Sequence, residues 1–82
     1  MSGEIDEAPA FRVGSVGITA EQRDAGIAAM HGRFRAWDVR GALTRAGVPY
    51  EALDRAADRL LQAERRAGRI RAINNRNWER QP

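Results

Sequence analysis

The 82-residue chain contains no cysteine and no lysine, and it has one histidine, three prolines and five aromatic residues. Without cysteine it can form neither disulfides nor thiolate metal sites. A chain of this length holds one domain with a modest core, because small proteins bury a small share of their surface. The fold must therefore be stabilised by packing of helices and short strands, or by self-association.

Long apolar runs are also missing. No segment approaches the roughly 20 apolar residues that a membrane-spanning helix requires. Glu4, Asp6 and Glu7 make the N-terminus acidic, which is the opposite of the cationic start of a signal peptide. These features predict a cytoplasmic protein with no membrane partner.

Residue patterns that support catalysis are scarce. The single histidine, His31, falls near the end of an expected helix, and neither Ser2 nor Ser15 has an adjacent base. The glycines match no phosphate-binding loop between a strand and a helix. We therefore expect no enzymatic activity, no metal, no cofactor and no small-molecule substrate.

Charge is distributed unevenly along the chain. All 14 basic residues are arginines, and three of the 11 acidic residues lie in the first ten positions, which leaves 8 carboxylates against 14 guanidinium groups. Such a balance favours polyanionic partners. A coding bias toward arginine would explain the absence of lysine better than it explains the net excess. The pattern predicts an acidic, disordered arm over residues 1–17 and a basic domain over residues 18–82.

The first half of that domain has short elements. The segment "FRVGSVGI" is expected to be an extended arm, because Gly14 and Gly17 weaken a strand. In "TAEQ", Thr19 and Gln22 have the spacing of a capping box and predict a helix that runs to about His31. A three-residue strand is expected in "RFRAW", and a short helix in "WDVRGALTRAG".

The longest predicted helix covers residues 49–67. Its inner side is formed by Leu53, Ala56, Ala57, Leu60, Ala63, Glu64 and Ala67, and its outer side by Arg55, Arg59, Gln62 and Arg66. Gly68 ends it. The following stretch alternates Ile70 and Ala72 with arginines, turns at "NNRN", where asparagine tolerates positive φ, and returns as a strand with Trp78.

This order resembles a winged helix-turn-helix. The residues that carry the resemblance are "TAEQ", "FRAW", "ALTRAGVPYEALDRAADRLL" and "GRIRAINNRNW", and together they cover residues 19–80. The resemblance implies an α+β, mainly α fold with three helices and a two- or three-stranded antiparallel sheet. It also implies a DNA-binding regulator or accessory factor that uses helix 49–67 and a wing at residues 69–80. The positions that would contact DNA are Tyr50, Arg55, Arg59, Gln62, Arg66, Arg69, Arg71, Asn75 and Arg76.

Two alternatives remain. Glu51, Asp54 and Asp58 oppose phosphate binding, so the arginines of the long helix fit an ordinary solvated face nearly as well. Winged helices also act as protein-interaction or dimerisation modules. We expect Trp37 and Trp78 to lie in the core, and an exposed ring would favour a protein interface.

Overall fold

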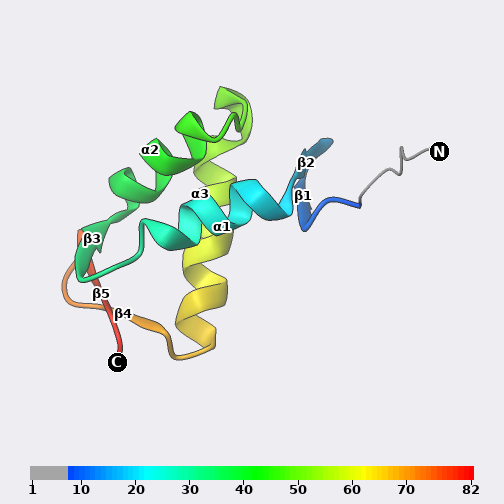
Figure 1. Ribbon diagram of the computed structural model, residues 1–82. Coiled ribbons are helices and arrows are strands. Elements are labelled where there is room, and N and C mark those ends of the chain that lie inside the picture. The colour runs from blue at the N-terminus through cyan, green and yellow to red at the C-terminus, as the bar shows by residue number, and fades with distance from the viewer. Residues whose placement is uncertain (1–7) are drawn as a thin grey trace.

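The computed structural model describes residues 8–82. Within them lie three helices and two small antiparallel sheets (Figure 1). The elements are β1 (Phe11–Val13), β2 (Val16–Ile18), α1 (Ala20–Ala28), β3 (Arg33–Arg35), α2 (Ala36–Arg45), α3 (Tyr50–Arg66), β4 (Ile70–Ala72) and β5 (Asn77–Arg80). This is the predicted α+β fold class.

Part of the predicted N-terminal arm is ordered. Residues 1–7 lie outside the described residues, but residues 11–18 form the β1–β2 hairpin, in which Val13 and Ile18 are buried. The expectation of an unstructured arm is therefore wrong for residues 11–17. Gly14, which we counted against a strand, has a φ of 60° in the turn. A glycine at the first position of a two-residue hairpin turn is a favourable arrangement.

The start of α1 follows the predicted capping box. Gln22 N donates to Thr19 Oγ1 at 3.0 Å, and Thr19 N donates to Gln22 Oε1 at 3.0 Å. The helix is shorter than expected and ends at Ala28 rather than near His31. Gly26 is buried inside it, and a Cβ there would approach Leu60 Cδ1 to 2.7 Å and Leu43 Cδ2 to 3.0 Å. This glycine therefore lets α1 pack closely against α2 and α3.

Helices α2 and α3 lie at the positions predicted for a helix-turn-helix pair. Gly47, with a φ of 96°, lies in the turn between them. Gln22 Nε2 donates to Ala46 O at 3.3 Å and connects α1 to the end of α2. Pro49 is the N-cap residue of α3 and Ala67 is its C-cap residue. The helix is therefore one residue shorter at each end than predicted.

The core lies where the three helices meet the inner face of the sheet. Its buried hydrophobic residues are Val13, Ile18, Met30, Phe34, Val39, Ala42, Leu43, Val48, Ala52, Leu53, Ala56, Ala57, Leu60, Leu61 and Ile70. Ala63 and Ala67, expected on the inner side of α3, are exposed.

The prediction of two core tryptophans is wrong for Trp37. Trp78 is half-buried and packs against the core, whereas Trp37 is 67% exposed. Val39 and Leu43 turn inward on α2. At 100° per residue, Trp37 lies about 200° from Val39 around the helix and so projects to the opposite side.

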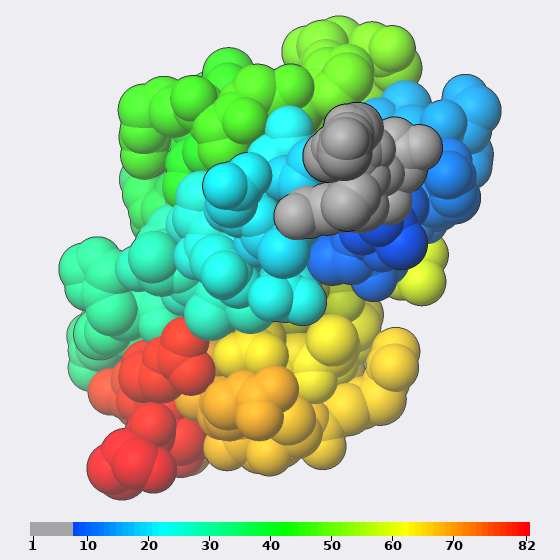
Figure 2. Space-filling model, turned by 45° about the vertical axis from the view of Figure 1, so that its right-hand side comes forward, coloured from blue at the N-terminus to red at the C-terminus, as the bar shows by residue number. Residues whose placement is uncertain are grey.

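The second sheet has the strand order β3-β5-β4. Together with the element order, this arrangement is consistent with winged-helix topology, in which the strand after the first helix pairs with the last strand. Figure 2 shows these C-terminal strands at one end of the molecule, the β1–β2 hairpin at the other, and α1 between them.

The turn of the wing forms where it was predicted, but by another mechanism. No non-glycine residue among those described has a positive φ. Instead, Asn74 Oδ1 accepts hydrogen bonds from Arg76 N and Asn77 N, each at 2.9 Å. Ile73 N donates to Asn77 O at 2.9 Å and closes the hairpin. The asparagine side chain thus stabilises the turn, as in an Asx turn.

Candidate nucleic-acid interface

Most of the DNA-contact residues predicted on α3 lie together on its outer face. Arg55, Arg59, Gln62 and Arg66 line one shallow groove of about 330 Å³, together with Asp58 and Ala63. The amphipathic pattern of the sequence predicted this grouping correctly. Tyr50, at the first turn of the same helix, is 81% exposed but does not line that groove.

The acidic residues Glu51, Asp54 and Asp58 of α3 differ in whether they have an ion-pair partner. Asp54 Oδ1 lies 2.8 Å from Arg40 Nε and joins α3 to α2. Glu51 and Arg55 have the spacing of an ion pair, yet no such pair within 4.0 Å is formed in the described part of the chain. Asp58 is the acid that shares the α3 groove. The groove therefore combines three guanidinium groups with one carboxylate.

The side chain of Arg59 contacts another part of the protein, the β1 strand. Its Nη1 donates to Arg12 O at 2.7 Å, and its guanidinium carbon lies 5.0 Å from the centroid of the Phe11 ring. Both contacts hold β1 against α3. We therefore assign Arg59 a structural role, although we had predicted that it contacts DNA.

Arg69 is also held internally. It donates to both carboxylate oxygens of Glu64, from Nε at 3.0 and 3.1 Å and from Nη2 at 2.8 Å. Arg80 Nη1 lies 3.5 Å from Glu64 Oε1, and Arg80 Nε donates to Met30 O at 2.7 Å. The cluster of Glu64, Arg69 and Arg80 thus fastens the wing to the end of α3.

Glu64 is the one buried charged residue among those described, with 4% of its surface exposed. The hydrogen bonds from Arg69 lower the pKa of Glu64, and the charges of Arg69 and Arg80 add to this effect, while burial opposes it. The same hydrogen bonds raise the pKa of Arg69. Both groups are therefore held in their charged forms, as a buried carboxylate requires.

The outer face of the three-stranded sheet is basic. Arg33 and Arg71 both lie opposite Glu79, and Arg35 lies opposite Asn77. Because side chains alternate across a strand, these five residues share one face. Arg71 Nη2 lies 3.4 Å from Glu79 Oε1 and is largely exposed. We had not predicted Arg33 and Arg35 as contact residues, although the alternation in "RFRAW" contained the signal.

The tip of the wing carries the remaining predicted residues. Asn75 and Arg76 are both exposed in the turn between β4 and β5. Their side chains form none of the hydrogen bonds or ion pairs found in the described part of the protein.

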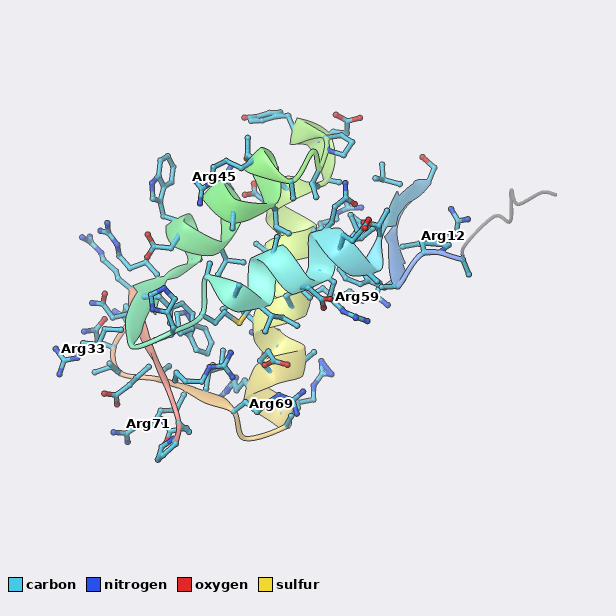
Figure 3. The ribbon with its side chains drawn as sticks, in the orientation of Figure 1. Arg12, Arg33, Arg45, Arg59, Arg69 and Arg71 are labelled. Carbon is cyan, nitrogen blue, oxygen red and sulfur yellow. The ribbon has the colours of Figure 1, made fainter. Side chains whose placement is uncertain are left out.

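The arginines are distributed over more than one side of the molecule. Figure 3 shows Arg33 and Arg71 extending from the sheet, Arg69 at the C-terminal end of α3, and Arg59 beside the strand that carries Arg12. The predicted set therefore divides into an α3 group (Tyr50, Arg55, Gln62, Arg66), a wing group (Arg71, Asn75, Arg76) and two residues with internal partners (Arg59, Arg69).

Two absences within residues 8–82 concern the site. No group of three His, Cys, Asp or Glu side chains is placed to hold a metal ion. None of the helices has the length and apolar character needed to cross a membrane.

Comparison of the chain with protein-family models, with curated proteins and with solved structures finds no match.

Proposed function

We propose that the protein binds duplex DNA, with α3 against a groove and the wing against the phosphate backbone. The proposal rests on one observation: two arginines of α3 have no carboxylate partner among the described residues. Arg55 and Arg66 are exposed and have no ion-pair partner within 4.0 Å among residues 8–82. An unpaired guanidinium can bind a phosphate or a guanine edge without first losing a carboxylate partner.

The element order supports the proposal. In a helix-turn-helix, the second helix of the pair reads base edges, and here that helix carries Gln62 between Arg55 and Arg66. Glutamine can pair with adenine through two hydrogen bonds. We therefore assign base contacts to Arg55 and Gln62, and a separate contact to Tyr50 at the first turn of the same helix. Arg66, Arg71, Asn75 and Arg76 would contact the phosphate backbone or the minor groove. A cytoplasmic location is part of the same proposal.

The test is fluorescence anisotropy of a labelled random-sequence duplex at low salt. The double variant Arg55→Ala, Arg66→Ala should bind more weakly than the unmodified protein. The single variant Arg23→Ala is the matched control, since Arg23 lies on α1 and pairs with its neighbour Asp24 at 3.0 Å. A loss of log K in the double variant that is only about twice the loss in Arg23→Ala would mean that net charge alone matters, and no loss in the double variant would remove α3 from the mechanism.

The second candidate is a winged-helix module for protein interaction or dimerisation. The exposure of Trp37 and of Tyr50 favours it, because both rings border a groove of about 490 Å³ whose lining includes Val48 and Leu53. Sedimentation at increasing protein concentration tests self-association. A dimer that dissociates in the variant Trp37→Ala would support this candidate, whereas a monomer at all concentrations would count against self-association.

A further inference from the structure

Trp37 also lines a separate groove of about 570 Å³ between α1 and α2. We call this the Trp37 groove. Its lining residues are Ala25, Ala28, Ala29, His31, Arg33, Phe34, Trp37, Asp38, Gly41, Ala42 and Arg45. It shares none of them with the groove on the outer face of α3. A contact here would therefore be independent of the proposed duplex contacts of α3.

The indole of Trp37 is supported from the side facing α3. The guanidinium carbon of Arg40 lies 5.7 Å from the ring centroid, and Asp54 holds Arg40 at 2.8 Å. Arg40 lines the neighbouring groove but not the Trp37 groove. The ring thus lies beside a cation that is paired with a carboxylate, and it also lines the Trp37 groove.

The Trp37 groove has positive charge available. Arg33 and Arg45 line it, and neither has an ion-pair partner within 4.0 Å in the described part of the chain. Its one carboxylate, Asp38, already accepts a hydrogen bond from Arg35 N at 2.8 Å. Much of the remaining lining is alanine and glycine, whose small side chains leave the groove open.

A flat aromatic ring beside two unpaired guanidinium groups suits one chemical class. Proteins bind single-stranded nucleic acids by stacking bases on aromatic rings while basic residues hold the phosphates. The volume of the groove falls within the range of small-ligand sites. We infer that the Trp37 groove binds an unpaired nucleotide of a single-stranded nucleic acid, with its base on Trp37 and its phosphates on Arg33 and Arg45.

Tryptophan fluorescence tests this inference directly, because the chain has two tryptophans. In the variant Trp78→Phe, Trp37 is the remaining tryptophan, and titration with oligothymidylate should quench its emission, excited selectively over that of Tyr50, to a saturating level. Anisotropy of a labelled oligothymidylate supplies a second measurement on the otherwise unmodified protein, in case replacing the half-buried Trp78 disturbs the fold.

Substitutions should separate stacking from charge. Trp37→Ala should raise the Kd for oligothymidylate by about 5- to 150-fold, the range expected for one stacked base, and Trp37→Phe should raise it less. Arg33→Ala and Arg45→Ala should each weaken binding and reduce its salt dependence. Ile73→Ala, which changes an exposed apolar side chain outside the groove, should leave it unchanged.

Three results would overturn the inference. Quenching of Trp37 by oligoglutamate as strong as that by oligothymidylate would make the groove a site for acidic peptides. Trp37 emission that changes with protein concentration and not with oligothymidylate would assign the ring to an interface between two chains. An unchanged affinity of the variant Trp37→Ala for oligothymidylate would show that no base stacks on the ring of Trp37. The duplex proposal fails separately, through the Arg55 and Arg66 variant.

Discussion

Arg59 has the environment of a structural residue. It lies on the exposed side of α3, yet it bonds to a backbone carbonyl of β1 and covers the ring of Phe11. The helical pattern correctly places it beside Arg55, Gln62 and Arg66. The pattern could not reveal its partner, because that partner comes from a hairpin 47 residues away in the sequence.

We expect the variant Arg59→Ala to lose about 1 kcal/mol of unfolding free energy, the usual contribution of one such hydrogen bond. Urea unfolding followed by tryptophan fluorescence measures this loss. Gln62→Ala, on the same face without such a contact, is the control and should change stability little. If Arg59→Ala were as stable as the unmodified chain, the hairpin would not depend on this contact.

Gly26 lowers the intrinsic stability of α1 but allows the three helices to pack closely. Glycine in the middle of a helix costs about 1 kcal/mol relative to alanine, and from the sequence it makes α1 look unstable. In the structure, Leu43 and Leu60 occupy the space where its side chain would lie. The cost within α1 is thus offset by close packing of the three helices.

Gly26→Ala should therefore destabilise the protein by about 1–3 kcal/mol through overpacking, reduced in part by the better helix propensity of alanine. Thermal unfolding followed by circular dichroism measures the effect. Gly41→Ala is a matched control in α2, where a Cβ would meet only Arg45 Nη1 at 3.4 Å. We expect Gly41→Ala to be neutral or stabilising, and equal effects of the two substitutions would contradict this account of α1.

The sequence predicted the elements that have a strong local pattern. The capping box of Thr19 and Gln22 and the amphipathic period of α3 depend on neighbours a few residues apart, and both are present. The β1–β2 hairpin was missed because its stability comes from packing of Val13 and Ile18 against distant helices. The prediction that Trp37 is buried was wrong, because it depended on the small number of aromatic residues. The angular position of Trp37 on α2 indicates an exposed side chain instead.

The site was predicted in part for the same reasons. The sequence placed Arg55, Gln62 and Arg66 on one face, since helical phase determines that face. It could not tell that Arg69 and Arg80 both converge on Glu64, because this cluster forms only when β5 returns beside β4 and brings Arg80 near the end of α3.

Glu64→Gln should lower the unfolding free energy at neutral pH by about 1.5–3 kcal/mol, the range for hydrogen bonds to charged groups. Because the folded state lowers the pKa of Glu64 below its ordinary value of 4.5, its ionised form contributes fully above that value. The contribution is lost as the pH falls through the lowered pKa. The stabilities of the unmodified protein and the variant should therefore converge in acid.

Urea titrations at a series of pH values measure this convergence. Glu79→Gln is the matched control, since Glu79 is more exposed and meets Arg71 at 3.4 Å. An exposed ion pair contributes less than about 1 kcal/mol, so this variant should stay close to the unmodified protein. A difference between Glu64→Gln and the unmodified protein that did not change with pH would show that the charge of Glu64 is not what stabilises the wing.

At the scale of the whole molecule, the sequence predicts opposite charges at the N-terminus and in the domain. Glu4, Asp6 and Glu7 precede a domain with a net positive charge. Like-charge repulsion between these carboxylates and phosphates opposes binding of nucleic acid. Deleting residues 1–7 should therefore increase duplex affinity at low salt. Unchanged affinity would show that these carboxylates do not compete with DNA.

The wing offers a second test of the proposed DNA binding. Arg71→Ala together with Arg76→Ala should weaken binding to every duplex and make the salt slope shallower by about 2, one for each lost phosphate contact. Gln62→Ala should instead change the preference among sequences. If the wing variant altered sequence preference and left the salt slope intact, the roles of wing and helix would be reversed.

We propose that Arg55 and Arg66 of α3 and Arg71 and Arg76 of the wing present unpaired or weakly paired cations to duplex DNA. A salt titration of binding to random duplex DNA tests it most directly. With Arg66, Arg71 and Arg76 on phosphates, log K against log salt should fall with a slope of about −3. No measurable affinity at low salt, or affinity that salt does not change, would contradict the claim.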